Sequence, residues 1–134
     1  MRRRFGVRAV AAFGLLSFLA GGVVWAQEAE PFIGSWKGSL TMMGTVLEIA
    51  LHFKLGDDRK IEGTFDSITQ GGYGIKLGKI ELAGTGISFI LDDPNAKGEP
   101  AFRGTLDESG KKLAGEFTQF GYEGTFAVER QPAD

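Results

Sequence analysis

The chain has 134 residues, including 21 glycines, no cysteine, 15 basic side chains and 17 acidic ones. Four of the basic residues and none of the acidic ones precede residue 27, so residues 27–134 carry 11 basic against 17 acidic side chains, a net charge of −6. This acidic balance argues against nucleic acid and anionic lipid as partners, and without cysteine the fold depends on core packing and strand pairing rather than on disulfides.

The first 26 residues have the pattern of a secretory signal peptide. Arginines at positions 2–4 and 8 form a basic start, and residues 9–24 are apolar and uncharged, but too short for a comfortable membrane span. Val24-Trp25-Ala26 places small residues where signal peptidase requires them, so we expect cleavage after Ala26; an uncleaved anchor helix is the alternative. The expected product is a periplasmic or secreted protein of 108 residues, enough for one domain and too few for two.

Residues 27–134 show the periodicity of β-strands and not that of helices. Residues 47–55 carry apolar side chains at every second position, with polar ones such as His52 between them, and residues 87–91 repeat the pattern. Alternation with a period of two indicates strands with one buried and one exposed face.

A five-residue unit, apolar-x-Gly-x-apolar, recurs along the chain. Its five copies are residues 36–40, 61–65, 102–106, 113–117 and 122–126. The first, third and fifth residues of a strand share a face, so each glycine lies between two core side chains. A glycine in mid-strand costs roughly 0.5–1 kcal/mol relative to alanine. Strong coiling of a closed sheet, with room for large neighbours such as Trp36 and Phe126, explains this cost better than a flat sandwich.

Turn signals rich in glycine and aspartate separate eight predicted strands. These strands are expected at residues 34–42, 45–55, 60–66, 74–83, 86–92, 100–107, 112–119 and 123–130. Short connections between neighbours predict an all-β fold, an antiparallel up-and-down barrel. The expected organisation is a signal peptide at 1–26, an N-terminal extension at 27–33, the barrel at 34–130 and a tail at 131–134.

Few residues suggest catalysis or metal binding. His52 is the single histidine, and strand alternation places it on the outward face, where we expect a solvated surface side chain. No Gly-x-Ser-x-Gly motif is present. Asp57-Asp58 and Asp92-Asp93 with Asn95 supply oxygen ligands of the kind calcium takes, but they lack the spacing of an EF-hand and fit turn positions better. We therefore expect no catalytic residue, no metal and no cofactor.

Two further features concern a binding site. Residues 66–74 form the longest break between strands and include Tyr73; they suit either the lip of a binding mouth or an Asx-type turn followed by glycines. Gln119 falls on the inward face two residues after Phe117, where an apolar side chain is expected. Its amide there needs a partner or a ligand.

Gly34-Ser35-Trp36 resembles the Gly-x-Trp opening of lipocalin-like and other calycin barrels. The resemblance implies that Trp36 closes one end of a calycin-like barrel and that Arg130, on the last strand, packs across it.

Residues 32–130 also resemble the small barrel domain of bacterial exported proteins, which is also found ahead of α/β-hydrolase domains. The resemblance rests on residues 34–40, 66–75 and 115–119 together with Arg130. It implies a calycin-like barrel of unassigned biochemical role. The chain departs from the family pattern at Phe120, where a small residue is usual, and at Lys76, where proline is common.

The predicted function is that of an exported, non-catalytic barrel that binds a small apolar molecule in its interior. The side chains expected to line such a pocket are Trp36, Phe65, Tyr73, Phe89, Phe117, Gln119, Tyr122 and Phe126. The same side chains are also able to fill the barrel solidly. In that case the expected function is an interaction or scaffold module, which binds a protein partner through exposed Met42, Met43, Tyr73 and Phe120. An enzyme is disfavoured because no activated group converges with another.

Overall fold

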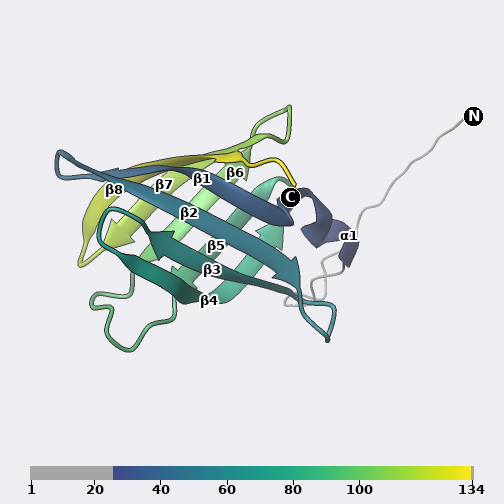
Figure 1. Cartoon of the computed structure of the whole chain (residues 1–134), viewed down its shortest axis with the longest axis horizontal. Helices are drawn as coiled ribbons and strands as arrows, with labels where there is room; N and C mark the ends of the chain where they lie inside the picture. The colour runs from purple at the N-terminus through teal and green to yellow at the C-terminus, as the bar shows by residue number, and fades with distance from the viewer. Residues whose placement is uncertain (1–25, 134) are drawn as a thin grey trace, which may run out of the picture.

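The computed structural model describes residues 26–133, which form a short helical segment and a closed antiparallel β-barrel (Figure 1). The strands are β1 (Gly34–Met42), β2 (Thr45–Leu55), β3 (Ile61–Ser67), β4 (Gly72–Ala83), β5 (Gly86–Leu91), β6 (Ala101–Leu106), β7 (Lys112–Gln119) and β8 (Tyr122–Arg130). Each strand pairs with its sequence neighbours, and β8 pairs with β1 to close the ring. The predicted eight-stranded up-and-down barrel is confirmed.

The burial of side chains follows the alternation in the sequence. In β3, Ile61, Gly63, Phe65 and Ser67 are buried, and the residues between them are exposed or half-buried. The strand ends agree with the predicted ranges to within two residues. The largest difference is at β4, which begins at Gly72 because the register shifts after Phe65 and lets Ser67 pair with Gly72.

The mid-strand glycines allow close approach of neighbouring groups. A Cβ added to Gly38 or to Gly115 would overlap the backbone carbonyl of the adjacent strand, at Ala127 and Arg103 respectively. At Gly104 the added atom would lie 2.8 Å from the Phe126 ring. The repeated glycines therefore serve two purposes: they permit tight coiling of the sheet, and they leave room for large core side chains.

Aromatic rings fill the centre of the barrel. The Phe102 ring packs against those of Phe65, Phe89, Phe117 and Phe126, with centroid separations of 4.8–5.5 Å. Phe89 in turn meets Phe53 edge-on at 5.9 Å. Offset and edge-to-face pairs of this kind stabilise a core beyond the burial of their area.

A short helical segment, which the sequence did not predict, covers one end of the barrel (Figure 1). It comprises α1 (Ala26–Ala29) and the 3₁₀ turn η3 (Glu30–Phe32), and it fully buries the side chains of Ala29 and Phe32. The Trp36 indole N–H donates a hydrogen bond of 2.9 Å to the Phe32 carbonyl. Trp36 thus joins the helical segment to the barrel core.

The predicted signal peptide lies outside the described residues except for Ala26, the first residue of α1. None of the helices within residues 26–133 has the length and the apolar character needed to cross a membrane.

Candidate functional site

The aromatic residues predicted to line an interior pocket separate into two groups. Five of them are core side chains with 0–5% exposure: Trp36, Phe65, Phe89, Phe117 and Phe126. Tyr73 and Tyr122 are instead 64% and 53% exposed. The four phenylalanines of the first group pack against the Phe102 ring, and Trp36 packs against Arg130. The two tyrosines lie at the barrel end away from α1, so the structure does not bring the two groups together around one cavity.

Gln119 has a protein partner. Its side-chain amide donates a hydrogen bond of 2.7 Å to the carbonyl of Lys97, in the loop between β5 and β6. The neighbouring Phe120 ring lies directly over Gly98, where an added Cβ would approach it to 2.7 Å. These contacts dock the β7–β8 hairpin onto that loop and satisfy the amide without a ligand.

Apolar side chains are exposed around the same end of the barrel. They come from the three hairpins that join β1 to β2, β3 to β4 and β7 to β8 (Figure 1). The exposed residues are Met43, Val46, Tyr73, Phe120 and Tyr122, at 53–70% exposure. We call this set the apolar rim. Met42, which we expected to be exposed, is half-buried and packs against the core.

The ladder between β3 and β4 is interrupted. Thr64 pairs with Lys76 and Phe65 with Ile75, whereas Ile61–Gly63 of β3 have no partner on β4. Beyond Lys76, β4 pairs with β5 and bulges between Gly78 and Glu81, where Lys79 adopts a φ of +50°. The two strands therefore diverge toward the end of the barrel that α1 covers.

A cleft of about 830 Å³ lies where the two strands diverge. Its apolar residues are Phe53, Ile61, Leu77 and Ile80, with Leu77 packed over Gly63. Its polar residues are Ser35, His52, Lys54, Asp58, Lys60, Glu62, Thr64, Lys76 and Lys79. The cleft thus combines an apolar base, where Ile80 is half-buried and the other three apolar side chains are at most 7% exposed, with a polar and charged border.

The charge around the cleft opposes the charge of the whole chain. Four lysines border it against two carboxylates, those of Asp58 and Glu62. Within residues 26–133 the ion pairs are His52 with Asp66 and Lys79 with Glu99. Lys54, Lys60 and Lys76 therefore have no carboxylate within ion-pair distance in this part of the chain.

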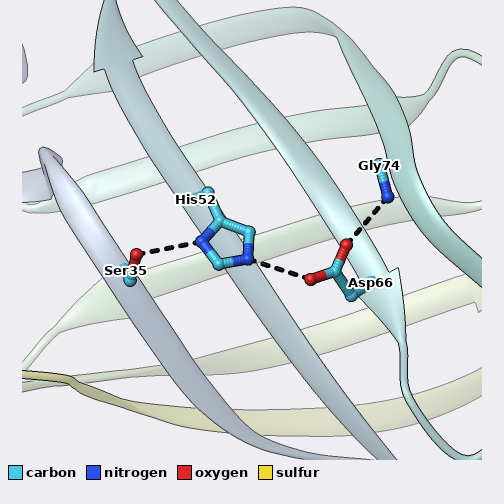
Figure 2. A network of polar contacts seen from close by, with 4 residues as sticks. All are labelled: Ser35, His52, Asp66 and Gly74. Carbon is cyan, nitrogen blue, oxygen red and sulfur yellow. Dashed lines mark hydrogen bonds and ion pairs between the residues drawn. The ribbon is translucent and has the colours of Figure 1, made fainter.

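A hydrogen-bonded network crosses four adjacent strands beside the cleft (Figure 2). Ser35 Oγ lies 2.9 Å from His52 Nδ1, and His52 Nε2 lies 2.9 Å from Asp66 Oδ2. The other Asp66 oxygen accepts a hydrogen bond of 2.8 Å from the backbone N–H of Gly74. His52 points outward, as predicted, and its side chain is 45% exposed, but both ring nitrogens are engaged.

The hydrogen-bond partners determine which tautomer of a neutral His52 ring fits the network. A carboxylate only accepts hydrogen bonds, so in the neutral ring Nε2–H donates to Asp66 and Nδ1 accepts from the Ser35 hydroxyl. Sequence reasoning did not identify this network. The contact between Ser35 and His52 was predictable from the first hairpin. A two-residue turn at residues 43–44 places Ser35 directly opposite His52, and the structure has this register.

The aspartate pairs considered for calcium form local turns. Asp58 accepts a hydrogen bond from the Lys60 N–H, and Asp93 accepts one from the Asn95 N–H. Asp107 has the same role between β6 and β7, where the Ser109 hydroxyl donates to it at 2.7 Å and lowers its pKa. Over the described residues, no three His, Asp or Glu side chains come together in a group able to hold a metal ion.

Neither a protein-family model nor a curated protein matches the chain. Among solved structures, the chain is similar to a redesigned β-barrel, b11L5F_LGL, with a TM-score of 0.61 and 20% identity over 78% of this chain and 96% of that one. The likeness is one of fold. A de novo designed fluorescence-activating β-barrel aligns over 78% of this chain and 98% of that one with a TM-score of 0.49 and 16% identity.

Proposed function

We propose that the chain is an exported, non-catalytic, calycin-like binding protein that takes a small molecule in the cleft between β3 and β4. The observation that carries the proposal is the divergence of these strands beside a barrel centre that is already filled. The 830 Å³ of the cleft falls within the range of about 300–1,000 Å³ that is usual for small-molecule sites. A ligand seated there covers apolar surface of the half-buried Ile80, and such burial contributes about 25 cal/mol per Å².

The calycin-like assignment is supported by the end of the barrel that carries Trp36. The guanidinium carbon of Arg130 lies 4.4 Å from the centroid of the Trp36 ring. Arg130 also donates hydrogen bonds to the carbonyls of Pro31 and Ile33. These bonds fasten the helical segment to the last strand of the barrel. The proposal of export is supported by the basic start and the apolar run of residues 1–26.

The network of Ser35, His52 and Asp66 is assigned a positioning role in this proposal. Nucleophilic catalysis requires donors aimed at the developing oxyanion in addition to a nucleophile and a base. The backbone donor in this network, the Gly74 N–H, is directed at Asp66 instead. By linking β1, β2 and β3 on their outer face, the network fixes one wall of the cleft.

A second candidate is an interaction module that binds a protein partner through the apolar rim. The exposure of Met43 and Tyr73, at 70% and 64%, favours it, because exposed apolar groups gathered at one end commonly mark contact surfaces. The two candidates place the ligand at opposite ends of the barrel and are separable by mutation.

The test measures binding of a neutral apolar dye, N-phenyl-1-naphthylamine, by fluorescence titration of the purified protein. Thr64→Trp fills the cleft from its outer border without altering a core side chain, and Ile80→Ser removes part of its apolar base. Both substitutions are expected to weaken binding about tenfold, whereas Tyr122→Ser at the rim leaves binding unchanged. If Tyr122→Ser loses binding while Thr64→Trp retains it, the dye binds at the apolar rim and the proposed site in the cleft is wrong. Thermal unfolding of each variant confirms that the barrel is intact.

A further inference from the structure

We propose that the molecule bound in the cleft is an amphipathic organic anion, whose acidic group lies between Lys60 and Lys76 and whose apolar body lies against Ile80. The inference depends on the proposed function, because it names the chemical class of ligand for that same site. It rests on the local reversal of charge, on lysines without ion-pair partners, and on an apolar surface within the same cleft.

The charge reversal is local and strong. Residues 27–134 carry six more acidic than basic side chains, yet lysines outnumber carboxylates four to two around the cleft. Lys79 is engaged by Glu99 at 3.6 Å. Among the described residues, Lys54, Lys60 and Lys76 have no carboxylate within ion-pair distance, and Glu62 is the cross-strand neighbour of Lys54. Positive charge collected in a concave site raises the local concentration of anions.

The apolar base restricts which anions fit. Phe53, Ile61 and Leu77 are at most 7% exposed, so the half-buried Ile80 supplies the accessible apolar surface beside the lysines, and an inorganic anion gains nothing from it. Lysine is suited to hold a small acidic group at the edge of such a base, since its ammonium is a compact charge on a flexible apolar stem. A ligand with an acidic group at one end and an apolar body at the other complements both parts of the site.

A long polyanion fits less well than a small one. The negative charge of the rest of the chain repels a polymer that extends beyond the cleft, and Glu62 and Asp58 stand at its border. The size of the cleft, about 830 Å³, also suits a single small molecule. The ligand class is therefore small amphipathic anions and not nucleic acid or a charged polysaccharide.

Two dyes that differ by one acidic group test the inference. The anionic probe is 8-anilino-1-naphthalenesulfonate, and the neutral probe is N-phenyl-1-naphthylamine, which lacks the sulfonate. We expect the anionic dye to bind more tightly to the wild-type protein, and its affinity to fall as salt is added while that of the neutral dye does not. The double substitution Lys60→Gln, Lys76→Gln is expected to lower the affinity for the anionic dye about fivefold, in line with two partly exposed ion pairs.

The matched control is Lys97→Gln, Lys112→Gln, which removes the same total charge from lysines outside the cleft and is expected to leave both affinities unchanged. An equal loss of anionic-dye affinity in the two double variants would overturn the inference, because the effect would then be one of overall charge. If both dyes bind equally well to the wild type and both are displaced by Thr64→Trp, the inference fails while the proposed function stands. If Thr64→Trp changes the affinity for neither dye, the inference and the proposed function both fail.

Discussion

The guanidinium of Arg130 lies over the indole of Trp36, 4.4 Å from its centroid, and donates to the carbonyl of Ile33 at 2.6 Å. One side chain thereby joins the last strand, the first strand and the segment that precedes it.

Arg130→Met is therefore expected to destabilise the barrel by about 2–3 kcal/mol, because it removes a cation–π contact and leaves carbonyls without their donors. Urea unfolding followed by tryptophan fluorescence measures the change. Arg103→Met, on the exposed face of β6, is the control and is expected to change stability by less than about 0.5 kcal/mol. Equal effects of the two substitutions would contradict the closing role of Arg130.

Phe102 is the centre of the aromatic core, with four rings within 5.5 Å of its own. Phe102→Ala is expected to cost about 3–5 kcal/mol, as a large side chain is lost and a cavity is left behind. Calorimetry or urea unfolding checks the value, and Tyr73→Ala, an exposed aromatic, provides the comparison. A loss of less than about 1 kcal/mol would show that the centre of the barrel is not solidly packed.

Gly38 on β1 lies close to the backbone of β8, and an added Cβ would overlap the Ala127 carbonyl. Gly38→Ala is expected to destabilise the protein by about 1–3 kcal/mol through this overlap. In Gly72→Ala the new atom meets Ile75 at an ordinary 3.7 Å, so stability should change little. Thermal unfolding of the two variants side by side tests the steric explanation; a larger loss in Gly72→Ala would refute it.

The network beside the cleft is expected to position strands and not to catalyse. Hydrolysis of p-nitrophenyl acetate should proceed at the same rate with the wild type and with Ser35→Ala. Asp66→Asn should lower stability by about 1 kcal/mol, since it weakens the hydrogen bonds to His52 and to the Gly74 N–H. Ester hydrolysis that disappears in both Ser35→Ala and His52→Ala would contradict the non-catalytic assignment.

The pKa of Asp107 is lowered, chiefly by the Ser109 hydroxyl. A carboxyl whose pKa is lower in the folded state than in the unfolded state contributes stability above its unfolded pKa, and loses that contribution as the pH falls through its folded pKa. Ser109→Ala should therefore be less stable than the wild type at neutral pH, with the difference diminishing in acid. Urea unfolding of both proteins across the acid range measures this; a difference that grows with acidity would contradict it.

Much of the fold was predictable because local signals agreed with one another. The alternation in residues 47–55, the mid-strand glycines and the turn residues each require the same strands, so their ends were located closely. The helical segment was missed since α1 and η3 together span seven residues, too few for a helical period to emerge.

The candidate site was less predictable for a physical reason. The alternation of side chains along each strand correctly placed Phe65 and Phe117 inward. Alternation alone does not show whether inward-facing rings enclose a cavity or pack against one another. The cleft depends on a bulge at which Lys79 takes a positive φ, and lysine carries no local preference for that conformation. Asp66 on β3 is a diagonal neighbour of His52 on β2. Their contact depends on the register between these strands, which the local sequence pattern determines only weakly.

The pairing of β1 with β8 also determines when the barrel is completed. Trp36 and Arg130 are register partners although 94 positions separate them, and the ring has no closed form until the last strand is present. Before its last strand is available, the chain can form only a curved open sheet with two unpaired edges, which are the surfaces most prone to join other chains. The stage before β8 pairs with β1 is therefore the one at which the chain is most exposed to aggregation.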